Sequence, residues 1–108
     1  MPVLVVLCTC PDDVVAAAIA RSVVEERLAA CVNRIPGVRS TYAWQGAVHE
    51  DAEVLLLIKT EASRFDALRE RVLALHPYEL PELIAVEVTR GLDRYLAWVV
   101  AAVAPSAE

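Results

Sequence analysis

The chain has 108 residues, a formal net charge of -5 and an apolar share of 57%, above the usual half for a soluble globular protein. This length predicts one soluble domain over residues 1–108, and the apolar excess predicts a partner surface. Lys and Arg are scattered singly, which argues against nucleic-acid binding, and no apolar run is long enough to span a membrane. The odd set of Cys8, Cys10 and Cys31 lacks disulfide-framework spacing, so we expect a cytoplasmic location.

The N-terminal part of the chain predicts a strand followed by a helix. Val3–Cys10 is a β-branched and Leu-rich run that stops at Pro11, as a buried strand does. Asp12 and Asp13 then supply a cap and negative charge for a helix N-terminus. Apolar residues recur at helical spacing from there, and this spacing predicts a helix that runs to about Ala30.

A long hairpin is expected next. Cys31–Trp44 has the composition of a strand, with a bulge at Pro36-Gly37, because proline removes a ladder donor and glycine permits the bend. Gln45-Gly46 marks a tight turn, and residues 47–60 form the returning strand. At about 3.3 Å per residue the first of these strands would span near 45 Å, so part of the hairpin must bend or protrude from a domain of this size.

The C-terminal half predicts a helix, a short strand and a last helix. Ser63 and Asp66 resemble a capping box that starts the first helix, which Pro77 stops. Residues 84–89 alternate as a fourth strand, and Asp93 is placed to cap the final helix.

This order, β-α-β-β-α-β, is that of an α+β ferredoxin-like sandwich with an antiparallel sheet and an additional C-terminal helix. Right-handed crossovers put both main helices on one face of the sheet and leave the other uncovered. Both faces of the first strand are apolar, and we expect subunit contact to bury the uncovered face, which we assign to Leu4, Val6 and Cys8. The chain is therefore expected to form a homo-oligomer.

Several blocks in order along nearly the whole chain carry a family likeness: residues 5–12 (VVLCTCPD), 25–33 (EERLAACVN), Pro36-Gly37, 42–46 (YAWQG), 53–60 (EVLLLIKT), 76–82 (HPYELPE) and 95–98 (YLAW). Together they closely resemble the CutA family. The resemblance implies a homotrimer in which three sheets pack together, tolerance to divalent cations, and binding of copper or another divalent metal ion. It implies a metal-response protein and not an enzyme.

The resemblance also implies a metal site. The bacterial family uses a cysteine on the first strand and two adjacent histidines before a Pro-Tyr pair, and these positions correspond to Cys8, Leu75 and His76. One ligand is therefore missing at Leu75. A thiolate and an imidazole suit copper or zinc, but the site is incomplete unless water, Cys10 or a neighbouring subunit completes it.

Structural interpretations of these residues stand beside the functional one. Cysteines in an apolar strand, such as Cys8 and Cys10, commonly pack as small inert hydrophobic residues. His76, just before a proline at a helix end, suits the last carbonyls and the helix dipole. His49 lies among acidic residues near the hairpin tip, where a solvated surface is expected.

Four residues are interface candidates. Tyr42 and Trp44 belong to the aromatic class that anchors oligomer interfaces. Glu53 and Lys59 flank the apolar centre of one strand, where they either pair across subunits or mark the start of solvent.

Two other functions remain alternatives. A regulatory module similar to the trimeric PII signalling proteins would hold a small ligand or partner protein in clefts between subunits, although the tight Gln45-Gly46 turn leaves no room for a long ligand loop. An acylphosphatase-like enzyme would need an anion-binding loop with an arginine after the first strand, and that segment is acidic here.

Overall fold

The computed structural model describes residues 2–105, and the elements follow the predicted order. They are β1 (Val3–Cys10), α1 (Asp13–Glu25), β2 (Cys31–Trp44), β3 (Ala47–Glu61), the short 3₁₀ turn η1 (Ala62–Arg64), α2 (Phe65–Leu75), β4 (Ile84–Glu87) and α3 (Asp93–Ala102). The strands form one antiparallel sheet in the order β2-β3-β1-β4. The predicted ferredoxin-like α+β fold with an added C-terminal helix is confirmed.

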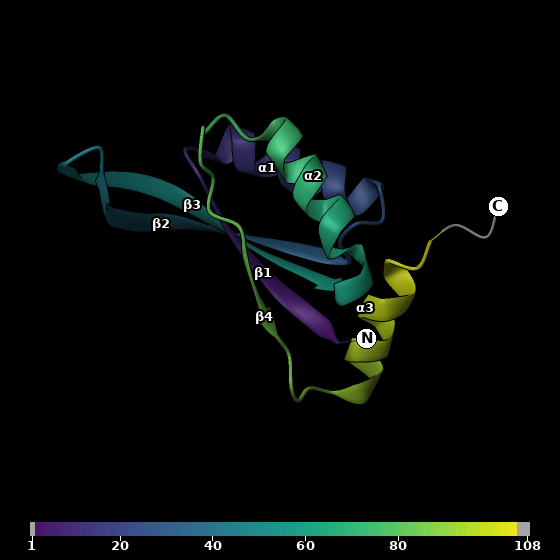
Figure 1. Ribbon diagram of the computed structural model, residues 1–108. Helices are drawn as coiled ribbons and strands as arrows, with labels where there is room; N and C mark the ends of the chain where they lie inside the picture. The colour runs from purple at the N-terminus through teal and green to yellow at the C-terminus, as the bar shows by residue number, and fades with distance from the viewer. Residues whose placement is uncertain (1, 106–108) are drawn as a thin grey trace.

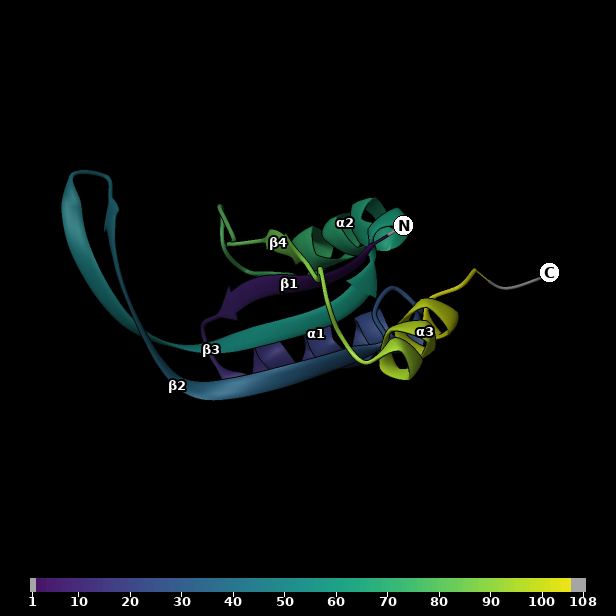
Figure 2. The same cartoon turned by 90° about the horizontal axis from the view of Figure 1, so that it is seen from below.

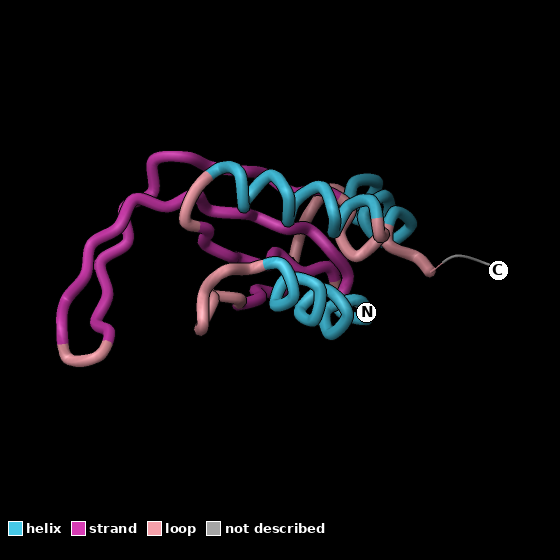
Figure 3. The backbone as a smooth tube through the Cα atoms, turned by 90° about the horizontal axis from the view of Figure 1, so that it is seen from above, coloured by secondary structure: helices cyan, strands magenta, loops and turns pink. Residues whose placement is uncertain are grey.

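The helices are divided between the main layer and one end of the sheet. α1 and α2 lie side by side over one face, whereas α3 packs at one end of the sheet against β1 and β3 (Figures 1 and 3). α1 begins where predicted, because the Asp12 carboxylate accepts a hydrogen bond of 2.9 Å from the Val15 N–H. No helix within residues 2–105 has both the length and the apolar character that crossing a bilayer requires.

The β2-β3 hairpin has the two predicted irregularities. Gly37 has a φ of 82°, and the strand register shifts between Ile35 and Val38, so the expected bulge is present. At the tip, Gln45 and Gly46 have φ values of 51° and 80°, as the central residues of a type I′ turn do. The hairpin extends well beyond the helices, and the molecule measures 47 × 30 × 21 Å (Figure 2).

The core lies between the sheet and the α1-α2 layer, and here one expectation was wrong. Leu4, Val6 and Cys8 pack under the helices within a single chain, at most 7% exposed, and do not belong to the uncovered face. Alternation along β1 defines two sets of residues, but both sets are apolar, so the pattern did not show which set meets the helices. The uncovered face carries the other set.

That uncovered face, which we call the open face, remains apolar. Val5 pairs with Val86, and Leu7 pairs with both Leu57 and Ile84 across neighbouring strands. Val86 and Ile84 are 57% and 54% exposed in the single chain. The open face therefore carries an apolar patch formed by Val5, Leu7, Leu57, Ile84 and Val86.

Three helix ends differ from prediction. α1 ends at Glu25, not Ala30, because Arg27 adopts a φ of 60° and turns the chain toward β2. The Ser63-Asp66 capping box does not form, since the Glu61 carboxylate instead accepts a hydrogen bond of 2.6 Å from the Ser63 N–H. Asp93 lies in the first turn of α3 and makes no capping hydrogen bond, Leu92 being the cap residue.

Candidate metal centre

Two thiols point from β1 into the helix-covered core. Cys8 pairs with Leu56 and Cys10 with Val54 on β3, and because side chains alternate along a strand, both thiols lie on the same face. Each cysteine is fully buried, and each is a free thiol. The sequence spacing therefore places two sulfur atoms in an apolar layer.

His76 reaches the same place from the end of α2. Its backbone N–H donates to the Val72 carbonyl at 2.9 Å, and Pro77 then prevents another helical turn. The His76 side chain is only 8% exposed, and its Nε2 lies 2.8 Å from the Thr9 carbonyl oxygen. A carbonyl oxygen accepts only, so Nε2 carries the proton. The Nδ1 atom then accepts a hydrogen bond of 3.1 Å from the Tyr78 N–H.

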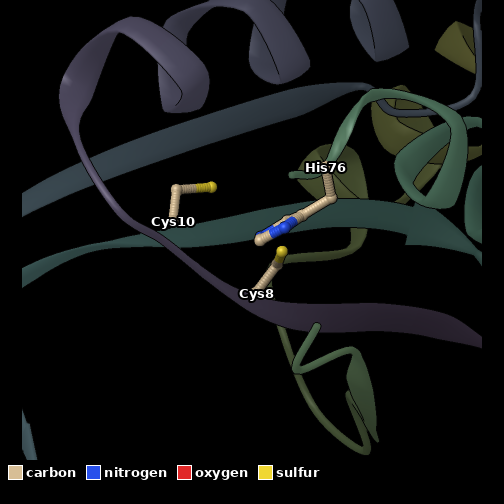
Figure 4. Close-up of side chains that lie close together, drawn as sticks. All are labelled: Cys8, Cys10 and His76. Atoms are coloured by element: carbon tan, nitrogen blue, oxygen red, sulfur yellow. The ribbon is translucent and has the colours of Figure 1, made fainter. Parts of the chain in front are cut away.

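The three side chains converge on one point (Figure 4). The ligand atoms of Cys8, Cys10 and His76 all lie within 4.8 Å of one another, and all three residues are buried. Two sulfur atoms and one imidazole nitrogen are the donor types that bind copper and zinc. The residues present therefore fit a soft or borderline metal ion, which the predicted ligands Cys8 and His76 would hold, with the Cys10 sulfur beside them.

The two thiols also affect each other. The hydrogen-bonding interaction with Cys10, together with burial, raises the pKa of the Cys8 thiol well above its ordinary value. The same interaction lowers the pKa of Cys10, against the opposing effect of burial. One proton of the pair is consequently held much more tightly than the other, and Cys8 is a poor nucleophile without a metal ion.

A cleft of about 650 Å³ adjoins the centre. It is lined by Thr9, Ser40, Thr41, Tyr42, Ala43, Trp44, Glu53, Tyr78, Glu79, Leu80 and Glu82. The Tyr78 hydroxyl donates a hydrogen bond of 2.7 Å to the Glu53 carboxylate, and burial and this carboxylate raise the pKa of Tyr78. Through Tyr78, which also contacts the His76 ring at a centroid distance of 4.7 Å, the cleft adjoins the metal centre.

The interface candidates lie in different places. Tyr42 and Trp44 project from β2 and are 42% and 38% exposed, whereas Glu53 is only 8% exposed inside the single chain. The Lys59 ammonium contacts the Asn33 side chain on the neighbouring strand. The His49 ring stacks on the Tyr42 ring, with 5.5 Å between the ring centroids.

The sequence did not predict one group of the centre, the Thr9 carbonyl, and it left the role of Cys10 undecided. The Thr9 carbonyl orients His76, yet a backbone acceptor leaves no mark in a sequence. Cys10 had a signal, the Cys-x-Cys spacing on a strand, which placed it on the same face as Cys8. Leu75 offers no ligand atom and packs against the core.

Comparisons with known proteins agree with this architecture. The family profile described as CutA1 divalent ion tolerance protein matches residues 4–102. The "Divalent-cation tolerance protein CutA" of Thermus thermophilus is 55% identical over 94 residues, covering 87% of this chain and 91% of that protein. The human "Protein CutA" is 54% identical over 91 residues, covering 84% of this chain but only 51% of the human protein.

Solved structures give the same result. The structure of a divalent cation tolerance protein from Thermus thermophilus matches with a TM-score of 0.93 and 51% identity, covering 94% of this chain and 99% of that one. CutA1 from Oryza sativa matches with a TM-score of 0.94 and 44% identity, covering 98% of this chain and 97% of the rice chain. The chain spans about half the length of the mouse, human and cattle relatives.

Proposed function

Because the chain belongs to the CutA1 divalent ion tolerance family, we propose that it is a trimeric, non-enzymatic protein that binds copper or another divalent metal ion and takes part in the response to metal ions. The convergence of the buried Cys8 and His76 side chains carries this proposal. A bound ion would cross-link β1 to the end of α2, and a metal bound only by the folded chain would stabilise it.

The proposed binding is tested with metal-free protein that carries no tag. We expect about one copper or zinc ion per chain, and we expect Cys8→Ser and His76→Ala to weaken the affinity. A Cys31→Ser variant is the matched control, because Cys31 pairs with Lys59 and so lies on the open face of the sheet. Metal affinity equal to that of the wild type in all three variants would contradict the assignment of Cys8 and His76.

The open face supports the trimer. Val5, Leu7, Val86 and Ile84 form an apolar surface that water contacts in the single chain. Full burial of such side chains contributes about 1.5–3 kcal/mol each, so packing three sheets together would supply a large driving force. Tyr42, Trp44, Glu53 and Lys59 remain the proposed contacts along the hairpin.

Light scattering tests the assembly. The wild-type protein should scatter with the mass of three chains, and Val86→Lys should lower that mass because it buries an unpaired charge. Val14→Lys serves as the control, since Val14 lies on α1 and is 81% exposed. A wild-type protein that stays monomeric at all concentrations would refute the trimer.

The non-enzymatic and cytoplasmic parts of the proposal rest on the thiols. Cys8 is buried and its raised pKa disfavours the nucleophilic thiolate, while all three cysteines are free, as in reducing compartments. We expect no turnover of acyl phosphates, and turnover that Cys8→Ser abolishes would contradict this part.

Cell fractionation should place the protein with cytoplasmic markers, although the names of relatives include a chloroplastic and a periplasmic protein.

The cleft favours a second candidate, a PII-like regulatory module. Its aromatic and acidic lining, with Tyr42, Trp44 and Glu53, has the size and mixed polarity of a small-ligand site. Calorimetry against a panel of nucleotides and metabolites should give specific heat if this function is correct. A flat response across the panel would exclude these ligands and leave the metal function.

A further inference from the structure

Cys10 is the donor that the proposed metal function leaves unassigned. Its sulfur lies in the same cluster as the Cys8 and His76 ligand atoms, in the buried layer under α1 and α2 (Figure 4). We propose that Cys10 is the third ligand of this centre and that the completed site selects monovalent copper, Cu(I). This inference rests on the proposed metal function and extends it by naming a ligand and an oxidation state.

A third donor from the same chain removes the need for one from elsewhere. Cys8 and Cys10 both belong to β1, so the strand holds their sulfur atoms on one side, and His76 is held against the same strand by Thr9. Small adjustments of side-chain rotamers bring three atoms that already lie within 4.8 Å of one another onto one ion. The site is thus complete in one subunit.

The number and type of the donors favour Cu(I). Soft thiolate ligands suit Cu(I), and a structural Zn²⁺ site takes four protein ligands in a tetrahedron. Among the described residues, the cluster contains only Cys8, Cys10 and His76. Two thiolates balance the charge of Zn²⁺, but that ion would lack its fourth ligand, whereas a three-donor site satisfies Cu(I).

Apolar side chains border the two thiols on the neighbouring strand. The neighbours of the two cysteines on β3 are Leu56 and Val54, which are apolar and buried. The adjoining cleft is lined by Thr9, Glu53 and Tyr78 but by none of the three proposed ligands, which are all buried. The Glu53 carboxylate is engaged by the Tyr78 hydroxyl.

Coordination of the ion releases thiol protons and rearranges hydrogen bonds, but it changes no oxidation state. Each bound cysteine releases its thiol proton to solvent as its sulfur bonds to the ion, and the ion enters as Cu(I). His76 gives up one of two hydrogen bonds, either to the Thr9 carbonyl or from the Tyr78 N–H, according to which ring nitrogen binds. The hydrogen bond that remains would orient the ring, as second-shell partners of metal-bound histidines do.

The test measures Cu(I) affinity of the full chain by anaerobic competition with a coloured Cu(I) chelator in the presence of a reductant. Cys10→Ala and Cys10→Ser should each lose more than about 100-fold in affinity, because even second-shell substitutions commonly cost 10–100-fold. Cys31→Ser, on the opposite face, should bind as the wild type does. Circular dichroism and the urea midpoint of each metal-free variant establish that it is folded.

A second measurement does not depend on affinity. X-ray absorption of the copper-loaded protein should show two sulfur neighbours per copper in the wild type and one in Cys10→Ala, with one nitrogen neighbour in both. In competition with Zn²⁺, the wild-type protein should keep Cu(I).

The possible failures can be told apart. Wild-type affinity in both folded Cys10 variants, with weakened binding in Cys8→Ser, would overturn the role of Cys10 and leave the proposed metal function intact. Displacement of Cu(I) by equimolar Zn²⁺ would overturn the choice of ion. No binding of Cu(I), Cu²⁺ or Zn²⁺ by the wild type would overturn the proposed metal function as well.

Discussion

Replacing His76 by alanine in metal-free protein separates its structural role from any role as a ligand. The side chain joins β1 to the segment after α2 by two hydrogen bonds, of 2.8 Å to the Thr9 carbonyl and 3.1 Å from the Tyr78 N–H. His76 itself is 8% exposed, so the alanine variant leaves the Thr9 carbonyl with only the long contact of 3.9 Å from the Cys8 thiol in a nearly dry environment.

The expected loss follows from these two groups. An unsatisfied buried acceptor costs about 1–3 kcal/mol, and the half-buried Tyr78 N–H, which water can reach in part, adds about 1 kcal/mol. We therefore expect His76→Ala to lower the free energy of unfolding by about 2–4 kcal/mol. His76→Gln retains a donor and an acceptor and should lose about half as much or less.

Urea unfolding with a chelator present measures this loss. At a slope of about 2 kcal/mol/M, the middle of the typical range, the midpoint of His76→Ala should fall by about 1–2 M, and that of His76→Gln by less. All samples need the same protein concentration, because association adds to apparent stability. Midpoints of His76→Ala and wild type within about 0.3 M of each other would refute the structural role and the magnitude derived from it.

Three further predictions concern the rest of the molecule. Thr60→Val should lower stability by about 1–3 kcal/mol in urea unfolding, because the buried Thr60 hydroxyl donates a hydrogen bond of 2.7 Å to the Leu28 carbonyl; an unchanged midpoint would contradict that bond. Gln45→Asn should raise the thermal midpoint by an amount equivalent to about 0.5–1 kcal/mol, since Asn tolerates the φ of 51° better; a lower midpoint would argue against the type I′ turn. The pKa values of Tyr42, Tyr78 and Tyr95 are all raised, by the Asp51 hydrogen bond for Tyr42 and by burial first for the other two. Tyrosinate absorbance of the folded protein should therefore appear above pH values near 10. The stability that the neutral tyrosines contribute is fully present below about pH 10 and should be lost as the pH rises through the folded-state pKa values. Full ionisation of the tyrosines at about pH 10 in the folded protein would show that these environments are wrong.

The strands and turns could be predicted because their signals are local. Alternation defined the two faces of β1, and Pro36-Gly37 and Gln45-Gly46 marked the bulge and the turn through backbone constraints that act within two residues. The end of α1 could not be predicted, because residues 26–30 have no strong helix breaker and the left-handed Arg27 is set by the approach of the chain to β2. Glu61 was missed as a cap because the 3₁₀ turn begins earlier than the apolar spacing of α2.

The candidate site was predicted only in part. The family motif predicted Cys8 and His76 as ligands, and the alternation of side chains along a strand places Cys10 on the same face as Cys8. The three side chains come together only because α2 ends directly over β1. The assignment of Leu4, Val6 and Cys8 to the open face was wrong for a related reason. A strand that is apolar on both sides does not reveal which side the helices cover, and only the three-dimensional packing decides it.

The hydrogen bond between His76 and Thr9 joins residues 67 positions apart, and this separation sets an order of events during synthesis. The β1 thiols leave the ribosome long before the histidine that closes over them. At about 5–20 residues per second the interval is roughly 3–13 seconds, during which both sulfur atoms belong to an unfinished sheet. Closure of the cluster is therefore a late step, and a nascent chain must keep two exposed thiols reduced until its second half has folded over the first.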